Sequence, residues 1–229
     1  ESRIQFQQLL KLKPDNADLA FAIALLSIQM GELDRAEIEL KQSLASGKKE
    51  SSTVHYYLAQ LHEAKKDNAT ALQEYQQVQE GDYLFQSRLR IAYLFAKSGK
   101  IKEAREVLHQ TKAKNDPQRE QLIVSETQLL REAKQYEQAF KVVNKAMETL
   151  HDNPTLMYEA AMLAEKLGKL AVSEEILRKV IKVEPEHAHA YNALGYSLME
   201  RKVRLVEAMT LVEKAYQLEP EDPAILDSM

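Results

Sequence analysis

Two pairs of histidines are the side chains best suited to bind a metal ion. His187 and His189 flank a single alanine, and His55 and His62 lie seven residues apart in a segment predicted to be helical. A metal site needs three or four converging ligands, and the chain has no cysteine to supply them. No compact cluster of glutamate and histidine completes either pair in the sequence. We therefore interpret these histidines as solvated surface groups and expect no metal ion and no cofactor.

Carboxylates could perform acid–base chemistry, and several stand close together in the sequence: Glu174, Glu175, Glu219, Glu221 and Asp222. We place them at helix starts or on exposed faces, where a carboxylate interacts favourably with the helix dipole and improves solubility. The sequence has no glycine-rich phosphate loop, no nucleophile elbow and no Ser/His/Asp pattern. These observations predict that the segment is not an enzyme.

Composition narrows the class of partner. The formal net charge is −4, and 29% of the residues are charged. No block of lysine and arginine of the kind that follows a phosphate backbone is present, so we do not expect nucleic acid as a partner. No apolar run approaches the roughly 20 residues that a membrane helix requires, so we expect no membrane insertion by this segment. The partner class that remains is a protein or a peptide.

The fold follows from a spacing of 33 to 35 residues between small side chains, each followed four residues later by a large or branched apolar one. These small residues are Ala36, Ala71, Ala104, Ala139, Ser173 and Ala208. A second set, twelve or thirteen residues earlier, is Ala24, Ala59, Ala92, Thr127, Ala161 and Gly195. Two small positions in each unit suit a pair of helices that cross at close range. The spacing predicts an all-α fold, a right-handed α-solenoid of stacked antiparallel helix pairs.

We divide the chain into one continuous array of six complete repeats with half a repeat at each end. The half repeats cover residues 1–16 and 223–229, and the complete ones 17–51, 52–84, 85–119, 120–153, 154–187 and 188–222. Helix pairs are predicted to start at Ala17, Ser52, Phe85, Glu120, Pro154 and Ala188. Because both ends fall inside a repeat, we expect a fragment of a longer protein, with a leader, a lipid anchor or more repeats outside it.

The turn inside each pair has its own signal. Gly31, Gly99 and Gly168 stand where the first helix should end, a place that favours the left-handed backbone conformation open to glycine. Lys66 and Lys134 hold the same place in the second and fourth repeats, which predicts a small cost in backbone strain.

These features resemble the tetratricopeptide repeat family over essentially the whole chain. The agreement is best in EHAHAYNALGYSLMERKVRLVEAMTLVEKAYQLEPEDP, which has the family's aromatic residue at Tyr191, its Leu194–Gly195 pair, Ala208 and Pro220. Two departures stand out. The fourth repeat has Glu126 and Thr127 where an apolar and a small residue are expected, so it packs loosely or gives Glu126 a buried partner. The sixth has one extra residue in its turn (ERKVRLVEA), which should bulge the hairpin without breaking the array.

The inserted turn and the following EPEDPAILDSM are also similar to a stretch of large proteobacterial tetratricopeptide proteins that are outer-membrane lipoproteins. This resemblance implies an adaptor that delivers clients to a carboxyl-terminal processing protease. It implies a location on the periplasmic side of the outer membrane, through an N-terminal lipid anchor outside this sequence. The alternative location is the cytoplasm.

A binding groove is predicted on the first helices, which line the concave face of stacked helix pairs. Tyrosine and arginine offer a large contact area with a polar group, which suits an extended peptide or a partner helix. The predicted groove residues are Phe21, Leu25, Tyr56, Tyr57, Arg90, Tyr93, Gln128, Arg131, Tyr158, Met162, Asn192 and Tyr196. The alternative is that several of these tyrosines only pack between neighbouring helices.

Three functions remain open from the sequence. The first is a non-catalytic scaffold that binds a protein or peptide in this groove. The second is the substrate-docking or regulatory region of a larger enzyme, such as a glycosyltransferase. The third is self-assembly, in which homodimers form through apolar faces of the terminal half repeats around Leu9–Leu10 and Ile225–Leu226.

Overall fold

The computed structural model describes residues 17–45 and 51–228, and all regular structure in these ranges is helical. The predicted half repeat 1–16 lies outside the described residues. The helices are α2 Ala17–Gln29, α3 Leu33–Ala45, α4 Ser51–Ala64, α5 Asn68–Gln76, α6 Leu84–Lys97, α7 Ile101–Gln110, α8 Asp116–Glu132, α9 Tyr136–Met147, α10 Pro154–Lys166, α11 Leu170–Val183, α12 Ala188–Glu200, α13 Leu205–Leu218 and α14 Pro223–Leu226.

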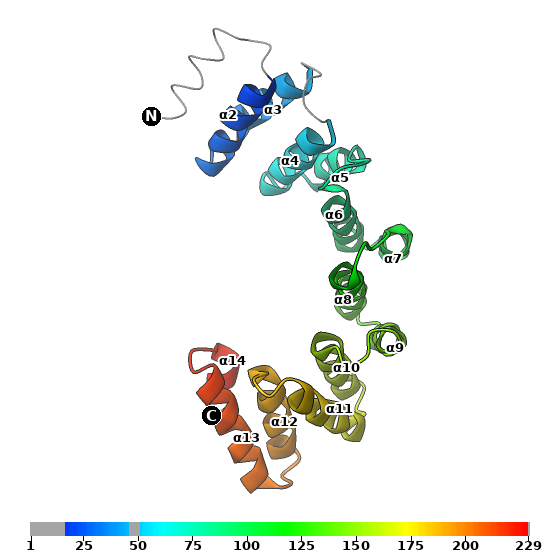
Figure 1. The fold of residues 1–229 in the computed structure, drawn as a ribbon, viewed down its shortest axis with the longest axis vertical. Helices are drawn as coiled ribbons and strands as arrows, with labels where there is room; N and C mark the ends of the chain where they lie inside the picture. The colour runs from blue at the N-terminus through cyan, green and yellow to red at the C-terminus, as the bar shows by residue number, and fades with distance from the viewer. Residues whose placement is uncertain (1–16, 46–50, 229) are drawn as a thin grey trace. The chain divides into compact units, whose positions relative to one another are not determined.

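The chain forms two compact units (Figure 1). Unit 1 is Glu1–Ala113 and contains α2 to α7; unit 2 is Lys114–Met229 and contains α8 to α14. Within each unit, every helix packs against the helix before it and the helix after it in the sequence. Short turns join the two members of each pair, so the expected all-α fold of stacked helix pairs is confirmed.

Most predicted helix starts are close to the observed ones. Three agree to the residue, at Ala17, Pro154 and Ala188, and the second and third pairs start one residue earlier than predicted. The start at Glu120 is wrong, because α8 begins at Asp116. Its cap is Asn115, whose side chain accepts a hydrogen bond from the Gln118 backbone N–H at 3.0 Å.

The turns behave as the sequence predicts. The backbone φ angles of Gly31, Gly99 and Gly168 are 75°, 80° and 71°, and Lys66 and Lys134 adopt the same region at 62° and 58°. The longer turn of the sixth pair contains two such residues, Lys202 at 55° and Arg204 at 48°. The extra residue is therefore absorbed by a second left-handed position, and α13 still packs on α12.

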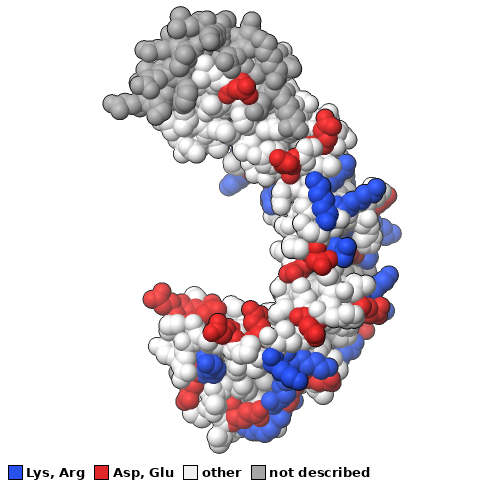
Figure 2. Space-filling model, in the orientation of Figure 1, with Lys and Arg blue, Asp and Glu red and all other residues white. Residues whose placement is uncertain are grey.

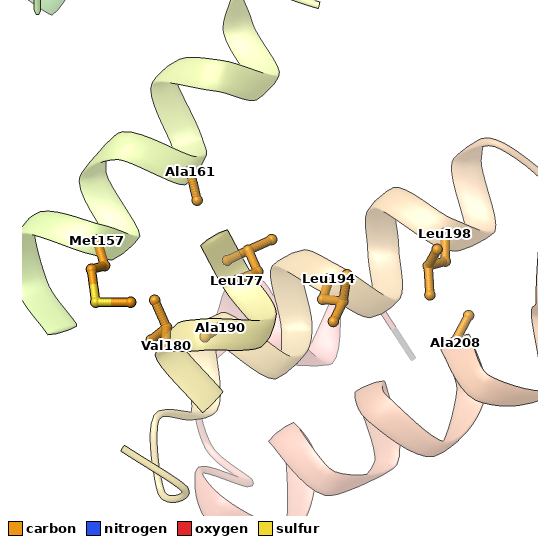
Figure 3. Packing of buried hydrophobic residues seen from close by; sticks show 8 residues of the cluster. All are labelled: Met157, Ala161, Leu177, Val180, Ala190, Leu194, Leu198 and Ala208. Atoms are coloured by element: carbon orange, nitrogen blue, oxygen red, sulfur yellow. The ribbon is translucent and has the colours of Figure 1, made fainter. Parts of the chain in front are cut away.

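The small residues lie at the helix crossings. All six members of the set that begins with Ala36 are fully buried, with 0% of their surface exposed. Larger apolar residues between them form a core that passes from pair to pair. Figure 3 shows this in unit 2, where Leu177 and Val180 of α11 lie between residues of α10 and α12. Within unit 2, these helix pairs thus bury their apolar faces against one another, as stacked repeats require.

The fourth pair keeps this packing despite its unusual residues. Glu126 is only 6% exposed and takes part in a polar interaction, while Thr127 fills the small-residue position at 0% exposure. The Thr127 hydroxyl is buried and has no hydrogen-bond partner among the described residues. Of the two expectations for this repeat, the structure supports a buried Glu126 that is engaged.

The C-terminal half repeat is partly buried within unit 2. Ile225 is fully buried against Ala188 and Ala215, whereas Leu226 remains 49% exposed. The expectation of an exposed Ile225 is therefore wrong, because α14 already packs on α12 and α13. The other predicted face, Leu9–Leu10, lies outside the described residues.

No helix in the described ranges is long and apolar enough to cross a membrane.

Ion pairs join neighbouring helix pairs at a recurring position. This position directly follows the buried small residue of the second helix in a pair, such as Ala36 or Ser173. In unit 1 this residue is Glu37, whose carboxylate accepts from Lys65 of the next pair at 2.7 Å. In unit 2 it is Glu174, which accepts from Arg201 at 2.8 Å and from Arg204 at 2.6 Å, both at the inserted turn. The extra residue thus brings a second arginine to this joint.

The arginines around Glu174 make its ionisation part of the stability of unit 2. Burial alone would raise the pKa of this carboxyl, but hydrogen bonds from Arg204, Arg201 and Arg178 outweigh it and lower the pKa to about 2. A carboxyl with a lowered pKa stabilises the fold above its unfolded value of 4.5, and this contribution is lost as the pH falls toward 2.

We expect Glu174→Gln to lower the free energy of unfolding near neutral pH by about 1–2 kcal/mol, because three arginines lose a charged acceptor, although Arg178 and Arg204 keep Glu207. The difference from wild type should shrink as the pH falls below 4.5 toward 2. Urea unfolding of both proteins across this range measures it. Glu175→Gln is the control, since Glu175 is exposed and, among the described residues, pairs only with Lys179 on its own helix, and it should leave the midpoint unchanged. A pH-independent difference would contradict the assignment.

Candidate functional site

The predicted groove residues fall mainly at two positions of each first helix. One position comes three residues before the small residue (Phe21, Tyr56, Tyr158 and Asn192), and the other comes directly after it (Leu25, Tyr93, Gln128, Met162 and Tyr196). These positions are four residues apart, so they lie on one face of a helix. At the second position Tyr93 is 38% exposed in unit 1 and Tyr196 is 49% exposed in unit 2. These two tyrosines present the most accessible aromatic surface of the predicted set.

In unit 1, an aromatic cluster includes the predicted residues Phe21, Tyr56 and Tyr57. It also includes Tyr83, which is outside the predicted set. The Tyr56 ring stacks on Tyr83 with centroids 4.4 Å apart, and Tyr57 meets Phe21 edge to face at 5.2 Å. The Tyr57 and Tyr83 hydroxyls lie 3.2 Å apart, and this hydrogen bond with burial raises the pKa of Tyr57 to about 12. Here the alternative interpretation applies, since these rings join α2, α4 and the segment before α6. Tyr83 gave no signal in the sequence because it lies in a linker.

Arg90 is engaged inside unit 1. Its guanidinium donates two hydrogen bonds to the Glu63 carboxylate, and it lies 4.6 Å from the centre of the Tyr93 ring. Glu63 also accepts from the Tyr75 hydroxyl at 2.7 Å. The hydrogen bonds to Glu63 raise the pKa of Arg90. Arg90 therefore contacts the Tyr93 ring while Glu63 balances its charge.

In unit 2, Gln128 and Arg131 line a cavity of about 400 Å³. The Arg131 guanidinium donates to Glu159 at 2.8 Å, and the Gln128 amide donates to Glu132 at 3.1 Å. Both glutamates also line the cavity, together with Val124, Tyr136 and Lys166. Tyr136 and Lys166 are outside the predicted set because they lie at helix ends. Tyr136 is the first residue of α9, and Lys166 is the last residue of α10. The cavity combines both charges with an apolar side, which suits a polar segment of a protein.

Tyr158 and Asn192 are tied to the elements that follow them. The Tyr158 ring lies 5.0 Å from the His187 ring and 6.5 Å from the His189 ring, and burial raises the pKa of its hydroxyl. The Asn192 amide nitrogen donates to the Ala224 carbonyl at 3.3 Å. Met162 is half-buried and packs against the core of unit 2. At this end of unit 2, Tyr196 is the exposed member of the predicted set.

Two histidine expectations are corrected. His62 is 7% exposed, not solvated, because its side of α4 faces Glu37 of the preceding helix pair. His55 is partly buried, and its Nδ1 lies 2.7 Å from the Glu74 carboxylate.

The expectation that no carboxylates join His187 and His189 is also corrected. Ligand atoms of His189, Glu219 and Asp222 lie within 4.8 Å of one another. These residues are 30 and 33 positions apart in the sequence, about one repeat, so stacking brings the next linker beside α12. His187 has a different role, since its Nδ1 accepts from the Ala190 N–H and caps α12.

Comparison with known proteins supports the same architecture. A family model described as tetratricopeptide repeat matches residues 21–83 and 158–223. The TPR repeat-containing protein PA4667 of Pseudomonas aeruginosa is 39% identical over 175 residues, which are 76% of this chain and 30% of that relative. The chain thus spans under a third of the length of this relative.

Solved structures share the fold at low sequence identity. The C-terminal part of a TPR repeat-containing protein from Cytophaga hutchinsonii has a TM-score of 0.72 and 17% identity, with 100% of this chain and 93% of that chain covered. A tetratricopeptide repeat protein from Parabacteroides merdae has a TM-score of 0.59 and 16% identity, with coverages of 99% and 89%. Together with the family match and the observed helix pairs, they show that this chain belongs to the tetratricopeptide repeat family, whose fold implies a scaffold for protein–protein interactions.

Proposed function

We propose that the chain is a non-catalytic adaptor that binds extended segments of partner proteins on the first helices of each unit. In its full-length context it acts on the periplasmic side of the bacterial outer membrane and brings clients to a carboxyl-terminal processing protease. The envelope location and the protease rest on the resemblance of the last complete repeat. The binding surface rests on the geometry of the first helices.

One observation carries the binding proposal. On the first helix of a pair, the position directly after the small residue holds an exposed tyrosine in two repeats, Tyr93 and Tyr196. In the fourth repeat the same position holds Gln128, which borders the cavity of unit 2. A large aromatic side chain that is accessible and has few rotatable bonds is well suited to anchor a partner. In unit 1 the Arg90 guanidinium lies 4.6 Å from the centre of the Tyr93 ring, a contact that favours one orientation of this ring.

We expect Tyr93→Ala and Tyr196→Ala each to weaken partner binding while changing the stability of the fold little, because both side chains are exposed. The measurement is capture from bacterial envelope extract with the wild-type chain and each variant as bait, followed by identification of the retained proteins. Tyr216→Ala is a matched control, since Tyr216 is 39% exposed but lies on the second helix of its pair. Tyr56 is unsuitable as a probe because it packs on Tyr83.

The proposal predicts that a processing protease or its substrate is retained by the wild type and by Tyr216→Ala and is reduced with Tyr93→Ala or Tyr196→Ala. Equal retention by all four baits would place the binding surface away from the first helices. Retention of cytoplasmic enzymes in place of envelope proteins would contradict the adaptor role in the envelope.

A further inference from the structure

We propose that His189, Glu219 and Asp222 form a binding site for a divalent transition-metal ion such as Zn²⁺. The three residues come from separate elements of unit 2: the first turn of α12, the end of α13 and the cap of α14. Each offers one ligand atom, and these atoms lie within 4.8 Å of one another. One imidazole and two carboxylates are a ligand set that zinc accepts in proteins.

The geometry needs only a small contraction. Zinc bonds to nitrogen and oxygen are about 2.0–2.2 Å long, so ligand atoms around a tetrahedral ion lie about 3.3 Å apart. His189 Nε2 and Glu219 Oε2 are already 3.8 Å apart. The side chains of His189 and Glu219 are 44% and 49% exposed, so both can rotate toward an ion without disturbing the core.

Asp222 provides the fixed point of the site. Its Oδ1 accepts hydrogen bonds from the backbone N–H groups of Ala224 and Ile225 at 2.9 and 3.1 Å, which holds the carboxylate in one orientation. A carboxylate that caps α14 through one oxygen keeps lone pairs for an ion. Ligands that are held before the ion binds lose less conformational freedom on binding.

The side chain of Asn192 also reaches the start of α14, beside the ligands. The amide oxygen of Asn192 is buried and has no hydrogen-bond donor among the described residues, although its amide nitrogen donates to Ala224. Asn192 lies three residues after His189 and therefore on the same side of α12.

The surrounding charge favours a cation. In Figure 2, acidic side chains gather over the part of unit 2 that Figure 1 labels α14. Glu184, Glu186 and Glu221 are exposed in the segments on either side of the three ligands. Local negative charge raises the concentration of cations at such a surface.

An ion at this site would fasten the linker between α13 and α14 to α12. It would also lie beside Asn192, one of the predicted groove residues. A site with three protein ligands leaves one coordination position open, for water or for a side chain of a partner. Metal binding and partner binding are therefore expected to meet at this end of unit 2.

The test is calorimetric titration of the untagged chain with ZnCl₂ and, separately, with MgCl₂. We expect one zinc ion per chain and no comparable binding of magnesium, which prefers oxygen ligands in octahedral geometry. His189→Ala and Glu219→Gln should each weaken zinc binding by at least about tenfold. Asp222→Asn should also weaken it while it preserves the cap, since asparagine is a good N-cap residue.

His151→Ala is the matched control because it removes an exposed histidine of unit 2, and it should bind zinc as the wild type does. Circular dichroism of each variant verifies that the helices are intact. The proposal is overturned if the wild type shows no saturable zinc binding below about 1 mM. It is equally overturned if His189→Ala and Glu219→Gln bind zinc with wild-type affinity. Neither result depends on a partner protein, so the adaptor proposal is tested separately.

Discussion

Glu63→Leu is expected to lower the free energy of unfolding of unit 1 by about 2–3 kcal/mol, because it removes the acceptor of three charge-assisted or buried hydrogen bonds. The Glu63 carboxylate joins three helices, since it lies on α4 and binds Tyr75 of α5 and Arg90 of α6. Tyr75 is 1% exposed, and its burial, followed by the bond to Glu63, raises the pKa of its hydroxyl. Leucine would leave this buried hydroxyl without an acceptor and Arg90 without its counter-charge.

The measurement is hydrogen exchange of backbone amides in α5 and α6 by mass spectrometry, together with urea unfolding. Local exchange is informative because stacked repeats open in parts and not always as one unit. Glu63→Gln is the matched control, since it keeps an acceptor for Tyr75 but loses the charge, and it should show a smaller loss. Wild-type protection of α5 and α6 in Glu63→Leu would show that the network contributes nothing to the joint.

This network also bears on the binding surface. Because Arg90 lies against the Tyr93 ring, Glu63→Leu should weaken any binding that depends on the orientation of Tyr93. The sequence analysis placed Arg90 among residues that touch a partner. In the structure its guanidinium also lies 4.6 Å from the centre of the Tyr93 ring, so it contacts an exposed aromatic side chain of the same set.

The helix pairs and their crossings could be predicted because they depend on constraints that recur or are local. A buried crossing admits only a small residue, so Ala36 and Ala71 mark their positions by size alone. A left-handed turn favours glycine, so Gly31 and Gly99 marked the turns that directly follow α2 and α6. The start of α8 was placed four residues late, at Glu120, whereas the capping bond that the Asn115 side chain accepts from the Gln118 N–H fixes it at Asp116.

The side-chain networks could not be predicted in the same way. Glu63 and Arg90 are 27 residues apart, and nothing in their types distinguishes this pair from the many exposed glutamates and arginines. Tyr83 lies in a linker, outside the helical register that predicts the groove residues. The cluster at His189 has a signal that could have been used, because Asp222 lies 33 residues later, close to one repeat.

Gly195 lies at a helix crossing that leaves no room for a Cβ atom. A Cβ atom built there would lie 2.9 Å from the Ala208 carbonyl oxygen and 2.7 Å from a methyl group of Val212. The equivalent position of the preceding pair is Ala161, which has a Cβ atom and is fully buried. The crossing of α12 and α13 is therefore closer than its neighbour, and backbone atoms of α13 limit it.

Gly195→Leu is expected to lower the free energy of unfolding of unit 2 by about 2–3 kcal/mol, because the added side chain must push α12 away from α13. Gly195→Ala separates two opposing effects. Alanine favours a helix over glycine by up to about 1 kcal/mol, so a peptide covering α12 should gain helix content. In the folded chain the contact with the Ala208 carbonyl should outweigh this gain and lower the unfolding midpoint in urea. If Gly195→Ala raised the midpoint of the chain as it raises helicity in the peptide, α12 and α13 would have room to separate at no cost, and the close crossing would not be a determinant of stability.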